Sequence, residues 1–248
     1  MDHLRALATH QAQFLETTRR ADPATPIPWL GDWTVEQLVV HLSRIYHWAS
    51  GQARRQASAS LGRGPFDLPR LFADCAAEAR TTLAELDPDA RAWALIDDGV
   101  PTAEQTGTVR FWHRRLANET LVHLWDLRTA VGEDLQAADD AWLDCLDEVV
   151  TVMHPRQLRL ERVAPPAGRV EFRPTGTDAS VTLGGAPHDA PRVVIAGPAH
   201  SLALLAWGRG SPDDDPLGAE GVEVVEGDEV VEGDRTLAAS ALRAGLTP

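Results

Sequence analysis

Lysine is absent from the sequence, so all 23 basic residues are arginine. This absence excludes chemistry that depends on a lysine amine, such as a Schiff base. Cysteine is scarce, because only Cys75 and Cys145 occur, far apart and in stretches that read as helical. Isolated cysteines are typical of unpaired thiols in a reducing compartment. We interpret both as small buried hydrophobic residues rather than as nucleophiles.

An excess of positive charge and a long apolar run are also missing. The formal charge of −14 repels phosphate backbones and anionic lipids, so neither nucleic acid nor a membrane surface is expected as a partner. No apolar run approaches the roughly 20 residues of a membrane span. The start, Met1 to Arg5, mixes acid and base and lacks the pattern of a signal peptide. We therefore predict a cytoplasmic protein.

The sequence does contain enough apolar material for a globular protein, with 44% hydrophobic and 24% charged residues. At 248 residues it is near the size at which one core stops growing, so two domains are expected. The first part reads as helices and the rest as short strands with two late helices. We place the boundary near Pro155, which gives a helical domain over residues 1–155 and a small α+β domain over residues 156–248. The predicted fold class is α+β.

A bundle of four or five antiparallel helices is predicted in the first domain. One helix covers residues 2–20, and a second begins at the capping box that Thr34 forms with Gln37. The interior of such a bundle is a usual place for a metal site. The remaining helices are expected over residues 68–86, about 103–131 and 137 to about 154.

Beyond Pro165 the pattern changes to an alternation of apolar and polar residues. Glycine, proline and aspartate turns separate the alternating runs, which is typical of half-buried strands. An apolar helix is expected from Pro198 to Trp207, and a last strand, turn and helix follow from Val222. The other predicted strands cover residues 168–173, 179–183 and 192–195.

Three residues of the helical domain have the types and spacing of a metal site. Glu119 and His123 are four residues apart on the predicted fourth helix, so their side chains share one face about 6 Å apart along the axis. His41, on the inward face of the second helix, supplies a third ligand if the two helices pack together. Two imidazoles and one carboxylate match a catalytic zinc set with one open position. The alternatives are an ion pair along the helix and a satisfied core histidine.

Asp126 lies three residues after His123 on the same stripe of the predicted helix. It either orients an imidazole as an outer carboxylate or completes the metal shell. His47 and His113 fall on other faces of their helices, and we interpret them as packing or surface residues.

Two segments, Trp33 to Leu42 and His113 to Asp126, resemble the mycothiol-dependent maleylpyruvate isomerase family, a branch of the DinB-like metal-binding bundles. The likeness covers nearly the whole chain and is most specific in the second segment. It implies a zinc site on the three residues above and a C-terminal α+β domain similar to sterol carrier proteins. Asn118 departs from the family, which often has histidine there. That position is turned about 100° from Glu119, so its pocket contacts rather than its ligand role are affected.

The resemblance implies an enzyme that uses a low-molecular-weight thiol, mycothiol, with a small electrophilic substrate, as a monomer or homodimer. Zinc would bind the thiol and deprotonate it, since a coordinated thiol loses its proton. Addition of the thiolate to a conjugated diacid, followed by bond rotation and elimination, gives cis–trans isomerisation. With a leaving group, the same attack gives S-transfer.

Two other classes of function remain open from the residues. A metal-dependent hydrolase would activate water instead of a thiol and would turn over without added thiol. A non-catalytic sensor would enclose an apolar ligand and hold a saturated metal shell, with Asp126 as the fourth ligand.

Arg209 is, with Asp126, the second candidate catalytic residue outside the metal ligands. It follows Gly208, which ends the apolar helix, and we expect it to point across the domain interface, where ligand clefts often form. A guanidinium group binds carboxylate bidentately, and the chain has no lysine to replace it. By resemblance the Gly-Arg pair recurs in the C-terminal domain of the family. The alternative is a surface arginine that complements the helix dipole.

Overall fold

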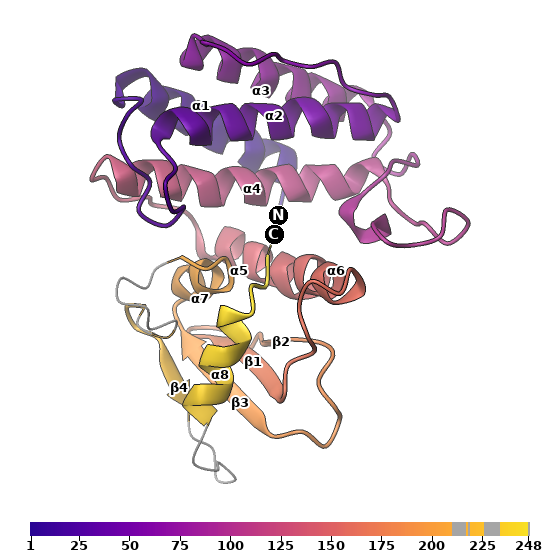
Figure 1. The fold of residues 1–248 in the computed structure, drawn as a ribbon, viewed down its shortest axis with the longest axis vertical. Helices are drawn as coiled ribbons and strands as arrows, with labels where there is room; N and C mark the ends of the chain where they lie inside the picture. Colours follow the sequence, from indigo (N-terminus) through magenta and orange to yellow (C-terminus); the bar gives the residue numbers. More distant parts are fainter. Residues whose placement is uncertain (210–216, 218, 226–233, 248) are drawn as a thin grey trace. The chain divides into compact units, whose positions relative to one another are not determined.

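The computed structural model of the protein describes residues 1–209, 217, 219–225 and 234–247 (Figure 1). The chain divides into two compact units, Met1–Gln136 and Ala137–Pro248. This division lies earlier than the predicted boundary at residue 155. The composition changes from helix to strand near 155, but the helix α5 (Asp139–Glu148) packs against α7 (Ala199–Ala206) and so belongs to the strand-bearing unit.

The first unit is a four-helix bundle, which confirms the predicted helical architecture. α1 packs against α3 and α4, and α2 packs against the same two helices, so each helix contributes to one common core. The predicted fifth helix is not part of it. The four helices are α1 (His3–Arg20), α2 (Val35–Arg54), α3 (Leu68–Glu85) and α4 (Val109–Ala130).

The ends of these helices follow local hydrogen bonding. The Gln37 side chain accepts a hydrogen bond of 2.8 Å from the Thr34 backbone N–H, as the predicted cap requires. α4, in contrast, begins at Val109 rather than near 103. The reason is that the buried Asp97 carboxylate accepts hydrogen bonds from the backbone N–H groups of Thr106 and Gly107, which holds that stretch as a loop.

The bundle core combines aromatic stacking with one buried polar bridge. Phe14 of α1 and Phe72 of α3 stack with their ring centroids 4.6 Å apart. The fully buried Tyr46 hydroxyl lies 2.7 Å from Thr120 Oγ1, which joins α2 to α4. Desolvation raises the pKa of Tyr46 well above its ordinary value, so the hydroxyl keeps its proton. This bridge fixes how α2 lies against α4, one residue along from Glu119.

Among its described residues, the second unit forms a four-stranded sheet in the order β2-β1-β3-β4. The sequence predicts the four strands but not their order. β1 (Arg169–Pro174) and β3 (Arg192–Gly197) are parallel to each other. β2 (Val181–Thr182) pairs antiparallel with β1, and β4 (Glu223–Val225) pairs antiparallel with β3. The turn predicted after β4 falls in residues 226–233, outside the described residues.

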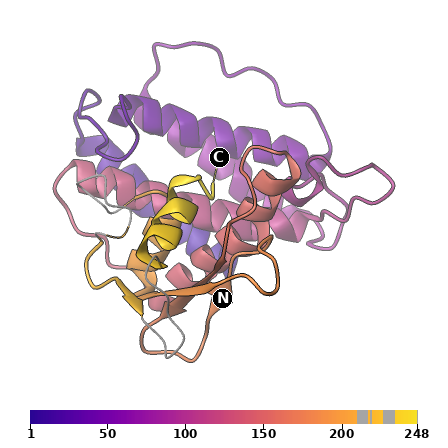
Figure 2. The same cartoon turned by 60° about the horizontal axis from the view of Figure 1, so that its bottom comes forward.

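Helices of the second unit pack on this sheet (Figure 2). α7 contacts β1 and β3, and α8 (Asp234–Arg243) contacts β3 and β4. α5 continues through a π-helical segment, Val149–Met153, into α6 (His154–Arg159), so this helical stretch extends beyond the predicted end near residue 154.

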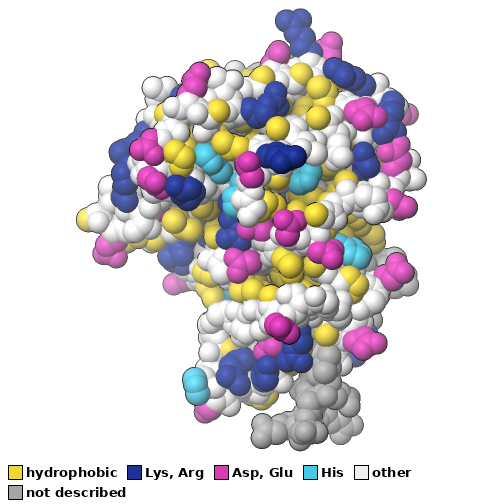
Figure 3. Space-filling view, turned by 180° about the vertical axis from the view of Figure 1, so that it is seen from behind, with side chains coloured by type: hydrophobic (Ala, Val, Ile, Leu, Met, Phe, Trp, Pro, Cys, Tyr) yellow, Lys and Arg dark blue, Asp and Glu magenta, His cyan; other side chains and the backbone are white. Residues whose placement is uncertain are grey.

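The burial of both cysteines agrees with the sequence analysis. Cys75 and Cys145 are buried and form no disulfide, and burial raises the pKa of the Cys75 thiol to about 11, which disfavours a nucleophilic role. On the face drawn in Figure 3, arginine and acidic side chains are interspersed. Among the described residues, no helix has both the length and the apolar character that crossing a membrane requires.

Candidate metal centre

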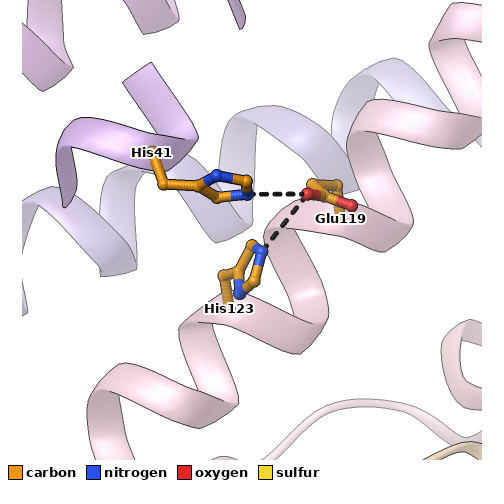
Figure 4. A group of neighbouring side chains, drawn as sticks. All are labelled: His41, Glu119 and His123. Carbon is orange, nitrogen blue, oxygen red and sulfur yellow. Dashed lines mark hydrogen bonds and ion pairs between the residues drawn. The ribbon is translucent and has the colours of Figure 1, made fainter. Parts of the chain in front are cut away.

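His41, Glu119 and His123 come together inside the first unit. One ligand atom from each lies within 4.8 Å of the others, and within the described ranges no other group of three such side chains meets this condition. His41 projects from α2, whereas Glu119 and His123 lie one turn apart on α4 (Figure 4). The structure therefore brings together the three residues that the sequence analysis selected, from two helices that are in contact.

A single oxygen of Glu119 lies at the centre of the group. Glu119 Oε1 lies 3.5 Å from His41 Nε2 and 3.2 Å from His123 Nε2, and the dashed lines of Figure 4 meet at it. The two imidazole rings are nearly perpendicular, with centroids 5.2 Å apart. Ligands about 2 Å from one tetrahedral ion are roughly 3.3 Å apart. Both separations from Glu119 Oε1 are close to that value, so the residue types and these two spacings are compatible with a divalent ion such as zinc.

The other Glu119 oxygen is already engaged. Glu119 Oε2 accepts a hydrogen bond from Arg115, one turn earlier on α4, and both side chains are buried. The guanidinium group thus leaves only Oε1 directed at the histidines. The sequence analysis missed Arg115, although its spacing of four residues before Glu119 places it on the ligand stripe and was the available signal.

Asp126 holds one of the two histidines. Its Oδ2 accepts a hydrogen bond of 2.9 Å from His123 Nδ1, and the Asp126 side chain is fully buried. Because Nδ1 carries the proton, Nε2 of the neutral ring has its lone pair available on the side of Glu119.

Exposure differs sharply among the three candidate ligands. The His41 side chain is 33% exposed, whereas Glu119 and His123 are 9% and 5% exposed. A small molecule would therefore reach the group from the side of His41. The other helical histidines lie elsewhere: His47 contacts Glu78 and the Ala59 carbonyl, and burial lowers the pKa of His113, which keeps it neutral in a packing role.

Comparison with known proteins assigns both units. Residues 4–128 match the mycothiol maleylpyruvate isomerase N-terminal domain, and residues 136–240 match the corresponding C-terminal domain. The chain belongs to the mycothiol maleylpyruvate isomerase family. The two matches divide at the boundary that the structure shows, near residue 136, and cover most of both units.

Solved structures of the mycothiol maleylpyruvate isomerase family share the fold of this chain. A crystal structure of the mycothiol-dependent maleylpyruvate isomerase has a TM-score of 0.61 and 14% identity, and the match covers 93% of this chain and 94% of that one. A histidine-to-alanine mutant of that isomerase matches with the same values. None of the curated proteins is significantly similar to this chain. Membership in the family confirms the predicted resemblance, and the protein is an enzyme of the isomerase type.

Arg209, the predicted carboxylate anchor, lies in the second unit directly after α7. It is 9% exposed, its Nη1 donates a hydrogen bond to the Trp207 carbonyl, and its guanidinium carbon lies 5.7 Å from the centre of the Trp207 ring. These contacts hold the guanidinium group beside the end of α7. A role for Arg209 in ligand binding stays a prediction.

Proposed function

We propose that the protein is a divalent-metal enzyme, with zinc on His41, Glu119 and His123, that uses mycothiol to isomerise a conjugated electrophile. The observation that carries this proposal is the convergence of two imidazole nitrogens on one Glu119 oxygen, in a family named for a mycothiol-dependent isomerase. A bound divalent ion supplies a Lewis acid that lowers the pKa of a coordinated thiol into the physiological range.

Hydrogen bonds from neighbouring residues orient two of the three proposed ligands. Asp126 fixes the ring orientation and the tautomer of His123 through the Nδ1–H hydrogen bond. Arg115 occupies Glu119 Oε2, which favours coordination through one oxygen only. Three protein ligands leave a further position for an exogenous thiol, and this distinguishes a catalytic set from a closed structural one.

The reaction class follows from a thiolate placed beside a conjugated double bond. The sulfur forms a bond to one alkene carbon, and the electron pair of the double bond moves into the adjoining carbonyl system. The former double bond then rotates as a single bond. The electron pair returns from the carbonyl system to re-form the double bond in the trans configuration, while the carbon–sulfur bond breaks and the thiolate leaves with its bonding pair. On a substrate with a leaving group, the same attack ends in S-transfer. Arg209 is our proposed anchor for a substrate carboxylate, because its guanidinium group can donate two parallel hydrogen bonds to the two oxygens of a carboxylate.

Metal analysis with a thiol titration tests the metal centre. His41→Ala, Glu119→Ala and His123→Ala should each lose stoichiometric metal, because two remaining protein ligands hold zinc weakly. His188→Ala, an exposed histidine of the second unit, is the matched control and should keep its metal. Full metal content in one of the three variants would remove that residue from the centre.

The thiol role has its own test. In the cobalt-substituted protein, mycothiol should produce a sulfur-to-metal charge-transfer band, and a conjugated cis diacid should isomerise only when mycothiol is present. Turnover without any thiol would instead indicate that the centre activates water. Arg209→Lys should keep its metal and lose about tenfold or more in kcat/KM, which corresponds to about 1.4 kcal/mol of transition-state binding. If Arg209→Lys has wild-type kinetics on a substrate that carries a carboxylate, Arg209 does not bind the substrate and only caps the helix.

A further inference from the structure

A cavity of about 350 Å³ opens in the first unit at the exposed side of His41. Trp33 forms one part of its wall and packs edge-on against the His41 ring, with the centroids 5.0 Å apart. Val40 and Phe66 add apolar surface, and Arg44 and Arg63 add two guanidinium groups. The cavity thus joins the accessible candidate metal ligand to apolar walls and to two positive charges.

The segment between α2 and α3, residues 55–67, supplies Arg63 and Phe66 and is held in place by hydrogen bonds. Arg44 Nη2 donates to the Gly62 carbonyl at 3.2 Å, and Ser58 Oγ donates to the His47 carbonyl at 3.0 Å. His47 also contacts the Ala59 carbonyl at 2.9 Å through Nε2, while its Nδ1 lies 2.7 Å from Glu78 of α3. These bonds tie the segment to α2, and His47 in turn contacts α3 through Glu78, so several hydrogen bonds hold this part of the cavity wall in place.

Among the described residues, no carboxylate forms an ion pair with either arginine of the cavity. Arg44 makes only its hydrogen bond to the Gly62 carbonyl, and the Arg63 side chain makes no ion pair or hydrogen bond within the part of the chain that the structure describes. Glu36 also lines the cavity and pairs with neither of them. Elsewhere in the first unit, ion pairs to carboxylates engage Arg20, Arg54, Arg70, Arg110 and Arg115.

The two guanidinium groups bring positive charge into one cavity of a chain that has 37 acidic and 23 basic residues. Arg44 follows His41 by three residues, so both project from the same face of α2. A carboxylate that enters the cavity would therefore meet positive charge next to the candidate metal ligand. Guanidinium groups bind carboxylates through parallel hydrogen bonds, and the apolar walls would cover the carbon skeleton of such a ligand.

We infer that Arg44 and Arg63 bind a carboxylate of the electrophilic substrate and position its carbon skeleton at His41. This inference rests on the proposed function for the identity of the ligand, although the anion site itself stands on the cavity. It assigns a second binding site for a carboxylate, within the first unit, in addition to the one predicted at Arg209.

Binding of maleate to the metal-loaded protein tests the inference directly, because calorimetry measures affinity without turnover. Arg63→Gln should raise the dissociation constant of maleate about five- to tenfold, and Arg44→Gln should do the same. The uncharged diamide of maleic acid should bind wild type weakly and be insensitive to both substitutions. The matched control is Arg70→Gln, which removes an exposed, ion-paired arginine of α3 and should leave maleate affinity unchanged.

Each outcome decides the question. Among the described residues Arg63 makes no hydrogen bond or ion pair that a substitution would break, so its variant should fold as wild type even if Arg44→Gln loosens the segment at Gly62. Maleate affinity unchanged in Arg63→Gln, an equal loss in the Arg70 control, or tighter binding of inorganic phosphate than of maleate would each overturn the inference. The proposed function fails separately, through missing metal or turnover without thiol. Arginine-dependent maleate binding would survive that failure.

Discussion

The hydrogen bond from His123 to Asp126 allows the sharpest test of the metal centre. Asp126→Asn keeps the size of a fully buried side chain and still offers an oxygen to the Nδ1–H group at 2.9 Å. What it removes is the negative charge on the acceptor. The substitution therefore isolates the electrostatic contribution of Asp126 to the basicity of the histidine that faces Glu119.

The size of the effect follows from the two kinds of hydrogen bond. A bond to a charged group contributes about 1.5–3 kcal/mol, and a neutral one contributes about 0.5–1.5 kcal/mol. The exchange thus costs about 1–1.5 kcal/mol, and since about 1.4 kcal/mol is a factor of ten, metal affinity should fall about five- to tenfold. Asp126→Ala should cost more, because it leaves a buried donor without this acceptor.

Competition for zinc against a chromophoric chelator measures this affinity. Asp74→Asn, an exposed carboxylate on α3 whose side chain is 74% exposed, is the control and should bind zinc as wild type does. Thermal unfolding with the metal removed checks that the Asp126 variants remain folded. Zinc affinities within twofold of wild type for both Asp126 variants would refute the view that Asp126 acts through His123.

Three further predictions concern stability and are measured by urea unfolding. Arg115→Met should destabilise the metal-free protein by about 3 kcal/mol, because the buried Glu119 carboxylate loses its ion-pair partner, and zinc should restore more stability to the variant than to wild type. Equal effects of zinc on both proteins would contradict this. Tyr46→Phe should cost about 1–2 kcal/mol through the lost bridge between α2 and α4 without lowering metal content, and a drop in metal content would assign the hydroxyl a part in the centre. Burial lowers the pKa of His10, of His113 and of His154, so the unfolded chain binds protons that the folded chain does not. Stability is therefore full above the unfolded pKa of about 6.5 and should fall as the pH drops below it, and a flat profile from pH 7.5 to 5.5 would disprove this.

The sequence predicts which three side chains come together, because its main signal is local. Glu119 and His123 share a helical face by spacing alone, and the face of His41 follows from the apolar period of its own helix. Arg115 has the same helical spacing relative to Glu119, but an arginine on a charged helix is more often exposed to solvent, so the spacing alone does not predict its buried ion pair.

The features that the sequence did not predict depend on contacts between distant segments. The unit boundary near Gln136 depends on α5 packing against α7, and no periodicity reports which partner a helix chooses. The late start of α4 depends on Asp97, whose carboxylate holds the loop backbone from ten residues away. The sequence likewise does not predict the cavity at His41, because the position of Arg63 in its wall depends on the path of the loop over residues 55–67.

The placement of the ligands on α2 and α4 has a consequence for how the chain holds together. An ion bound to both His41 and Glu119 would join positions 78 residues apart in the sequence and so act as a removable cross-link. Closing a loop of that length in an unfolded chain costs about 4.5 kcal/mol of conformational entropy in the chain-entropy view of cross-links. All of α3 and the segment that carries Arg63 lie inside this loop. Removal of the metal should therefore increase hydrogen exchange first in the backbone between the two anchor points, with the exchange of α1 following later.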